Sequence, residues 1–146
     1  MTTQPKATDP PKLAERAAAN ALLDERRFEE AHALLHSLVE EDGQEDRVGL
    51  LGNACRETGR LDEAELYYAR YREFAASAGA DLQFDAAIQS ALLAKKLGEP
   101  SRALTFFLEA RNLFARCRRP SVPRGELDGH VGRMIRELTG ALAIRV

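Results

Sequence analysis

Cysteine is scarce in this sequence, and its spacing excludes the usual cysteine-based scaffolds. Among 146 residues, the chain has only Cys55 and Cys117, and neither belongs to a CxxC pair. A zinc knuckle needs closely spaced pairs, and a small secreted domain needs a dense set of disulfides. Neither class fits, so we expect a protein of the reducing cytoplasm.

Long apolar runs are also missing. No segment approaches the roughly 18 uninterrupted apolar residues that a membrane-spanning helix requires. The first residues, MTTQPKATDPPK, contain three prolines and lack the apolar centre of a signal peptide. We expect residues 1–11 to form a disordered N-terminal segment of a protein that does not insert into membranes.

Catalytic motifs are absent as well. The sequence contains no GxxxxGK[ST] loop, no HExxH pair and no GxSxG elbow. His130 has no obvious nucleophile to act on nearby in the sequence. We therefore predict that the protein is not an enzyme and needs no cofactor.

Two features suggest binding sites, but we interpret both as solvated surface. The net charge is −2, yet residues 101–146 hold nine Arg against four Asp and Glu. The basic stretch RCRRPSVPR at 116–124 has no interleaved aromatic residues, so we predict that it complements a helix end and binds no nucleic acid. His32 and His36 are spaced i, i+4, which is compatible with a shared metal and an oxygen ligand from Glu29 or Glu40. We instead expect an exposed helix face and predict no metal.

Alanine, leucine, glutamate and arginine dominate the sequence, and no segment shows the Val/Ile/Thr alternation of a strand. This composition predicts an all-α fold. Helical periodicity and breakers place the helices near 12–25, 28–41, 46–58, 61–77, 84–97, 100–117 and 126–143.

Three segments can be superposed by their small residues. The anchors Ala31, Ala64 and Ala103 are separated by 33 and 39 residues. A small residue stands twelve positions before each anchor and a large one four positions after it. These are Ala19, Gly52 and Ala91, and then Leu35, Tyr68 and Phe107. The pattern predicts helical hairpins in which small residues allow the two helices to approach closely and large ones fill the space beside the crossing.

Breakers separate the two helices of each hairpin. Gly59 and Gly98 can supply the left-handed conformation that ends a helix, and Pro100 suits the first position of the next one. The first hairpin has Arg26 where the others have glycine.

The middle segment resembles the tetratricopeptide repeat through Leu51-Gly52, Gly59, Asp62-Glu63-Ala64 and Tyr67-Tyr68. The resemblance implies a right-handed superhelix of three hairpins within a domain at 12–146. Its repeats would span about 12–44, 45–78 and 84–117, with about five extra residues near 79–83 and a capping helix at about 126–143. In that repeat Cys55 stands at a buried position, so we expect it to pack, whereas the arginines beside Cys117 predict a thiol more exposed to oxidation.

The capping helix is expected because an open stack of repeats leaves its last apolar face in water. An apolar stripe at helical spacing is available to cover that face. It consists of Leu127, Val131, Met134, Ile135, Leu138 and Leu142.

More specifically, the chain is similar to the class II chaperones of bacterial type III secretion, which hold translocator proteins in the cytoplasm before export. The likeness lies in FEEAHALLHSLVEED at 28–42, in the first helix of the second repeat, and in Ala86-Ala87 before LLAKKLGEPSRAL. The short proline-rich beginning and the extra residues near 79–83 depart from that family. A homodimer is possible, but dimerisation does not transfer by analogy.

In this architecture the first helix of each hairpin faces the concave side, where a partner peptide would bind. Repeat register places the following residues on that face: Leu13, Arg16, Asn20, Leu23, Asp46, Gly49, Asn53, Arg56, Asp85, Ile88, Leu92 and Lys95. The mixture of polar and apolar side chains suits an extended peptide held by a few anchors. The alternative is that Asn20 and Asn53 bond neighbouring helices and that Leu23 and Leu92 pack inward.

Two functions are compatible with this sequence. The first is a chaperone or adaptor that captures an extended segment of a protein partner in the groove. The second is a structural scaffold that self-associates or assembles complexes without capturing peptides, with Tyr67, Tyr68, Tyr71 and Phe74 partly facing a partner.

Overall fold

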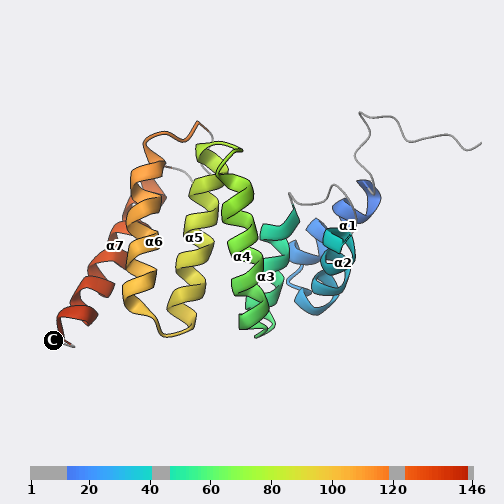
Figure 1. Ribbon diagram of the computed structural model, residues 1–146, viewed down its shortest axis with the longest axis horizontal. Helices are drawn as coiled ribbons and strands as arrows, with labels where there is room; N and C mark the ends of the chain where they lie inside the picture. The colour runs from blue at the N-terminus through green and yellow to red at the C-terminus, as the bar shows by residue number, and fades with distance from the viewer. Residues whose placement is uncertain (1–12, 41–46, 119–123, 145–146) are drawn as a thin grey trace, which may run out of the picture. The chain divides into compact units, whose positions relative to one another are not determined.

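The computed structural model describes residues 13–40, 47–118 and 124–144. These ranges contain seven helices and no strand, which confirms the all-α prediction (Figure 1). The helices are α1 (Leu13–Asp24), α2 (Phe28–Glu40), α3 (Val48–Glu57), α4 (Leu61–Ala75), α5 (Ala80–Lys96), α6 (Pro100–Phe114) and α7 (Arg124–Ile144). The predicted disordered segment at 1–11 lies outside the described residues.

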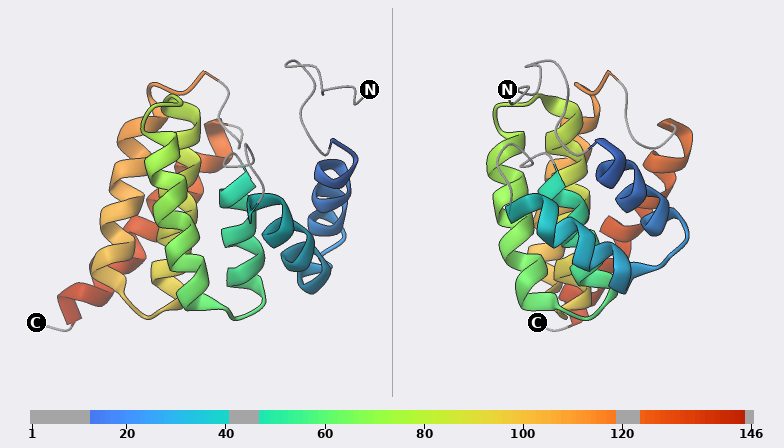
Figure 2. Two further views of the ribbon diagram at one scale, coloured as in Figure 1. Left: turned by 45° about the vertical axis from the view of Figure 1, so that its right-hand side comes forward. Right: turned by 90° about the vertical axis from the view of Figure 1, so that its right-hand side faces the viewer.

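The chain divides into two compact units, Met1–Tyr67 and Tyr68–Val146. In the first unit, α2 packs against both α1 and α3. In the second, α6 packs against both α5 and α7, and α7 runs obliquely behind α6 in the left view of Figure 2. The first and third predicted hairpins therefore form, each within one unit, while the right-handed superhelix stays a prediction.

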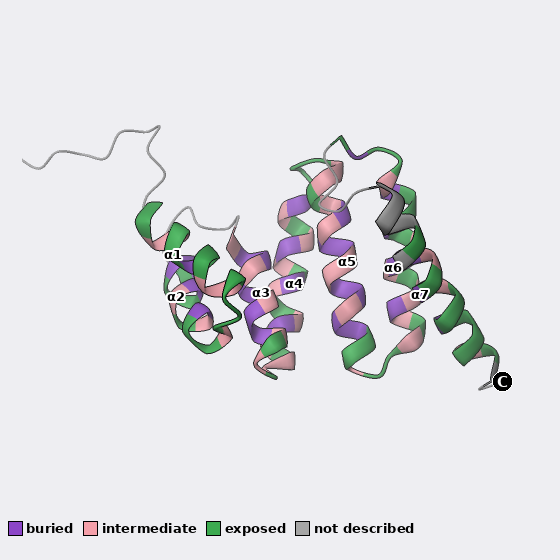
Figure 3. Ribbon diagram, turned by 180° about the vertical axis from the view of Figure 1, so that it is seen from behind, coloured by how far each residue is buried: buried purple, intermediate pink, exposed green. Residues whose placement is uncertain are grey.

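The small residues at the predicted helix crossings are buried, as the repeat pattern requires. Within the first unit, Ala19, Ala31 and Ala64 are all 0% exposed, and Gly52 is buried. In the second unit, the corresponding residues Ala91 and Ala103 are 0% exposed, and Figure 3 shows buried positions recurring along α5. The large residues Leu35, Tyr68 and Phe107 are also 0% exposed. The predicted packing positions are therefore confirmed.

Each hairpin turns at a residue with a positive φ angle. Gly59 and Gly98 have φ values of 79° and 74°, and Arg26 has a φ of 60° at the equivalent place. In each turn, the backbone amide of the following residue donates to a carbonyl five residues earlier. The N to O distances are 2.8 Å for Arg27 to Leu22, 2.8 Å for Arg60 to Cys55 and 2.9 Å for Glu99 to Ala94. This is the Schellman hydrogen bond, which satisfies a carbonyl at the helix end. Arg26 thus adopts the conformation that glycine provides in the other two turns.

Arg26→Gly should stabilise the protein. A side chain in the left-handed region costs about 1–2 kcal/mol, and an exposed contact of the guanidinium with the Phe28 ring returns about 0.5–1 kcal/mol. The net gain should be about 0.5–1 kcal/mol, measured by chemical denaturation. The matched variant Gly59→Ala has room for a Cβ but the same positive φ, so it should lose stability. A destabilised Arg26→Gly protein would contradict this account of the turn.

The extra residues near 79–83 were expected to lie between helices, and this prediction is wrong. Helix α5 begins at Ala80 and not at residue 84. Gly79, with a φ of 115°, separates it from α4. The new first turn is held at both sides, because the Asp81 carboxylate accepts the Arg118 amide at 2.9 Å and Gln83 Nε2 donates to the Ala76 carbonyl at 3.1 Å. The insertion is therefore an additional turn of helix.

Other helix boundaries differ from the prediction by one to three residues, the largest difference being the end of α6 at Phe114 where 117 was expected. Helix α3 begins at Val48, where a start at 46 was expected, and position 46 lies outside the described residues. Helix α7 begins at Arg124 and not at 126, which shortens the predicted loop at 118–125.

The capping helix covers the last hairpin as expected. Val131, Met134 and Leu138 are 3–6% exposed and belong to the core of the second unit, against which Ile135 packs. Leu142 is half-buried, and the side chain of Leu127 lies outside the described part. The stripe therefore does what a capping helix does in a stack of repeats.

Cys117 and the tyrosines are less accessible than the sequence suggested. Cys117 is 4% exposed, and its thiol donates to the carbonyls of Leu113 at 3.5 Å and Ala80 at 3.6 Å, so the expectation of an oxidisable thiol is wrong. Tyr68 and Tyr71 are 0% and 5% exposed. These two rings pack inside the chain and do not offer a surface for a partner.

Candidate functional site

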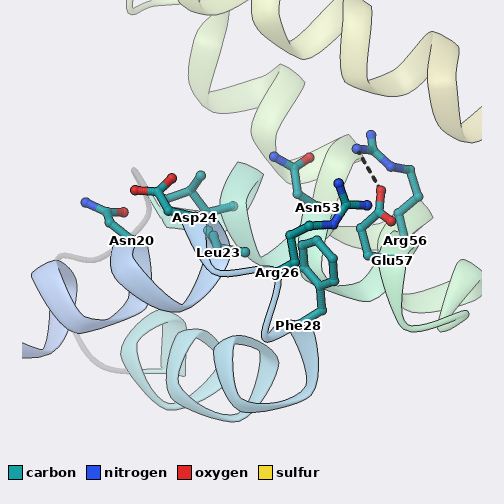
Figure 4. A pocket seen from close by; sticks show the side chains of 9 residues that line it. Asn20, Leu23, Asp24, Arg26, Phe28, Asn53, Arg56 and Glu57 are labelled. Carbon is teal, nitrogen blue, oxygen red and sulfur yellow. Dashed lines mark ion pairs between the residues drawn. The ribbon is translucent and has the colours of Figure 1, made fainter.

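A pocket of about 760 Å³ opens in the first unit, at the end of α1 and along α3. This volume falls within the range of ordinary ligand sites, about 300–1,000 Å³. It is lined by Asn20, Leu23, Asp24, Arg26, Phe28, Leu50, Asn53, Arg56 and Glu57. Figure 4 shows these side chains arising from α1, the turn after it, the start of α2, and α3.

Repeat register explains why four of these residues meet. Asn20 and Leu23 are spaced i, i+3 on α1, and Asn53 and Arg56 have the same spacing on α3, so each pair shares a helix face. Both pairs occupy the same repeat positions, because Asn53 follows Asn20 by the 33 residues that separate the first two anchors. Four of the predicted groove residues of the first two hairpins therefore line one pocket.

The pocket walls are polar and carry balanced charge. Arg56 Nη2 lies 3.5 Å from Glu57 Oε1, and this ion pair is drawn in Figure 4. Asp24 and Arg26 add one charge of each sign. The guanidinium of Arg26 lies over the Phe28 ring, 5.8 Å from its centroid. Such a surface offers hydrogen bonds of both kinds and no net charge.

Asn20 also has a partner within the chain. Arg47 Nη1 donates to Asn20 Oδ1 at 3.1 Å. Asn20 thus bonds the residue before α3, as the alternative interpretation allowed. The same side chain also lines the pocket. Asn53 and Arg56 are both half-buried on α3.

The remaining predicted groove residues do not line this pocket. In the first unit, Leu13 is 64% exposed at the start of α1, Arg16 is half-buried and Gly49 is buried. Asp46 lies outside the described residues. In the second unit, Ile88 and Leu92 pack against the core. Leu92 therefore packs inward, as the alternative allowed, and its substitution would test stability before binding.

Asp85 and Lys95 are also engaged within the second unit. The Tyr71 hydroxyl donates to Asp85 Oδ2 at 2.7 Å, and Gln89 Nε2 donates to Oδ1 at 3.4 Å. Burial, followed by the nearby Asp85 charge, raises the pKa of Tyr71 well above its usual value, so the phenol stays a donor. Lys95 Nζ lies 3.5 Å from Met134 Sδ. These side chains hold α4, α5 and α7 together.

Sequence reasoning missed five residues of the pocket: Asp24, Arg26, Phe28, Leu50 and Glu57. Arg26 carried a usable signal, since it replaces a glycine at a turn that needs a positive φ. Residues other than glycine in such strained conformations cluster at functional sites. The others depend on how the turn directs the chain, which repeat register alone does not give.

A second cluster of polar side chains lies elsewhere in the first unit. His32, Cys55 and Glu63 each have one potential metal-ligand atom, and these three atoms lie within 4.8 Å of one another. The His32 side chain is only 15% exposed, so the expectation that it sits on a solvated face is wrong. His36 is 46% exposed, and its Nε2 lies 3.9 Å from Glu40 Oε1.

Burial controls the ionisation of this cluster. It lowers the pKa of His32, an effect to which the positive charge of Arg60 adds. Burial also raises the pKa of the Cys55 thiol to about 12, so this cysteine is a neutral packing group in the metal-free protein. The prediction that Cys55 is buried is confirmed, since it is 0% exposed.

Among the helices of the described residues, none combines the length and apolar character needed to cross a membrane. The family model described as Tetratricopeptide repeat matches residues 22–95, which is about half of the 146 residues. Neither the curated proteins nor the solved structures contain a match to the chain. The matched range holds the turns at Arg26 and Gly59 and the buried anchors Ala31 and Ala64, and the chain belongs to the tetratricopeptide repeat family.

Proposed function

We propose that this protein is a non-enzymatic chaperone or adaptor that captures an extended peptide segment of a protein partner in the pocket between α1 and α3. Tetratricopeptide repeats generally mediate protein–protein interactions, and the proposal assigns that role to one site. The observation that carries it is the meeting of Asn20, Leu23, Asn53 and Arg56 in one open pocket.

The chemistry of the pocket suits a peptide backbone. An extended peptide presents amide donors and carbonyl acceptors in alternation, and the amide of Asn53 can bond both kinds of group. Arg56 supplies donors for a carbonyl, and the Glu57 carboxylate beside it accepts from an amide. Leu23 and Phe28 give apolar contacts for a side chain of the peptide.

The proposed class of partner is a translocator of a bacterial type III secretion system, which the protein would hold in the cytoplasm. Support for this finer proposal comes from the similarity of residues 28–42 and of α3 to the class II chaperones of that system. Translocators carry membrane-inserting segments, which need protection in water before export. A cytoplasmic partner-binding repeat protein suits that task.

The pocket is tested by substitution of its α3 residues. Peptides that bind the wild-type protein are first selected from a random displayed library, and their affinities are measured by calorimetry. Asn53→Ala together with Arg56→Ala should weaken the selected peptides by at least about tenfold, because hydrogen bonds to charged groups contribute about 1.5–3 kcal/mol each. Ser37→Ala, exposed on α2 and outside the pocket lining, should bind as the wild type does.

Two results separate the parts of this proposal. If the double variant stays folded by circular dichroism and binds every selected peptide with unchanged affinity, the pocket is not the capture site. Co-expression then tests the partner class: a soluble complex with a translocator that the double variant fails to form would support the finer proposal. A stoichiometric partner without membrane-inserting segments would refute it and leave peptide capture standing.

The scaffold alternative is weakened in one respect. Of the aromatic side chains expected to partly face a partner, Tyr68 and Tyr71 are buried, while Tyr67 and Phe74 are half-buried. Leu66 is 66% exposed on α4, but single exposed apolar side chains are normal on protein surfaces. We therefore propose the pocket, and not a self-association surface, as the functional site.

A further inference from the structure

Three helices of the first unit bring together three side chains that ligate transition metals. His32 comes from α2, Cys55 from α3 and Glu63 from the first turn of α4. Their ligand atoms lie within 4.8 Å of one another. These residues are distant in sequence, so the cluster results from the packing of the repeat and not from a local motif.

The imidazole of His32 supplies a second observation. Its Nε2 atom is buried and has no hydrogen-bond partner within the described part of the chain. Glu63 Oε2, the nearest charged acceptor, is 3.9 Å away, which is too far for a hydrogen bond. A buried nitrogen left without a partner is destabilising, so its position needs an explanation. A cation bound between the three side chains would satisfy this nitrogen directly.

We propose that His32, Cys55 and Glu63 form a binding site for Zn²⁺. The mixed set of nitrogen, sulfur and oxygen ligands favours zinc, whereas Ca²⁺ and Mg²⁺ prefer oxygen alone. A thiolate and a carboxylate together neutralise the charge of the ion. The Cys55 proton leaves to solvent as the Zn–S bond forms, so binding releases a proton.

The site can close around an ion with small movements. Zinc bonds of about 2.0–2.3 Å in a tetrahedron bring ligand atoms to roughly 3.5 Å from one another, somewhat nearer than they lie here. Glu63 is 45% exposed and begins its helix, so its side chain is able to make this adjustment. The exposed side of Glu63 also leaves the fourth position to water.

Arg60 is the charged neighbour of the three side chains and contacts one of them, Glu63. Arg60 binds Glu29 with two hydrogen bonds, of 2.9 and 3.2 Å, and its Nε lies 3.7 Å from Glu63 Oε2. In the zinc-bound protein Arg60 keeps Glu29, while Glu63 turns to the metal. The ion would then fasten α2, α3 and α4 to one another.

The test uses the full chain, purified under reducing conditions and freed of metal with a chelator. Zn²⁺ is titrated by calorimetry, and Co²⁺ is added as a spectroscopic substitute whose sulfur-to-metal absorption reports thiolate ligation. We expect one ion per chain, the thiolate absorption band, proton release and a rise of the melting temperature with excess Zn²⁺. Absence of saturable binding in the wild type would overturn the proposal.

Matched variants identify the ligands. Cys55→Ser and His32→Asn should each weaken Zn²⁺ binding by more than the roughly 10- to 100-fold loss caused by removing an outer partner of a ligand. Cys117→Ala and His36→Ala remove the other cysteine and the neighbouring histidine, and both should bind as the wild type does.

The variants are informative even if one of them folds poorly. Glu63→Gln changes a half-exposed side chain and should weaken binding in a protein whose circular dichroism is unchanged. If binding instead survives Cys55→Ser and is lost in His36→Ala, the ion is held by the i, i+4 histidine pair, and the proposal is wrong.

Discussion

Phe107→Ala should lower the free energy of unfolding by about 3–5 kcal/mol. Phe107 is 0% exposed and belongs to the core that α5, α6 and α7 build together. Removing its ring leaves a cavity between three helices that cannot all close in on it. Chemical denaturation followed by circular dichroism measures the change.

A control on the same helix separates this effect from a change of helix propensity. Asn112 is exposed on α6, so Asn112→Ala should alter stability by no more than about 0.5 kcal/mol. Wild-type stability in Phe107→Ala would mean that the second unit does not depend on this core.

Ala64→Leu should destabilise the protein by about 1–3 kcal/mol, because it inserts bulk at a tight crossing. Ala64 is 0% exposed on α4, and it stands twelve positions after Gly52, the buried small residue of α3. Neither helix can move away without disturbing the turn at Gly59. The thermal midpoint should fall accordingly and can be followed by calorimetry.

Ala69→Leu is the matched control, since it makes the same change on the exposed side of α4. This variant should melt within a few degrees of the wild type. Equal melting of the two variants would show that Ala64 does not mark a helix crossing, and the alignment of the repeats would need revision.

Local patterns in the sequence were sufficient to predict the hairpins. The period of small and large residues identified Ala31, Ala64 and Ala103, and all three are buried. The glycine turns were predictable because glycine is the residue that adopts a positive φ most readily. The start of α5 was not predictable in this way, because residues without a counterpart in the other repeats were assigned to the connection between helices. Ala80, Asp81 and Leu82 are nonetheless compatible with a helix, and Gly79 provides the break.

The candidate pocket was predicted in part for the same reason. Register placed Asn20 and Asn53 on equivalent faces, but it treated the third hairpin as another copy of the first two. There, Ile88 and Leu92 contribute to packing and Lys95 contacts Met134 of α7. The burial of His32 was also hidden, because sequence spacing compared it with His36 on its own helix, whereas Cys55 and Glu63 come from the next two helices.

The first turn of α5 has a consequence for how this chain tolerates changes in length. Beginning at Ala80 instead of 84, the helix is longer by about 6 Å at 1.5 Å per residue. Residues added at the N-terminal end of a helix leave the phase of every following residue unchanged, so Phe84 and Ala91 keep their inward positions. The Asp81 carboxylate then secures the new end to the Arg118 amide. In evolution or in engineering, this hairpin can gain or lose a helical turn at that end while its core stays in register.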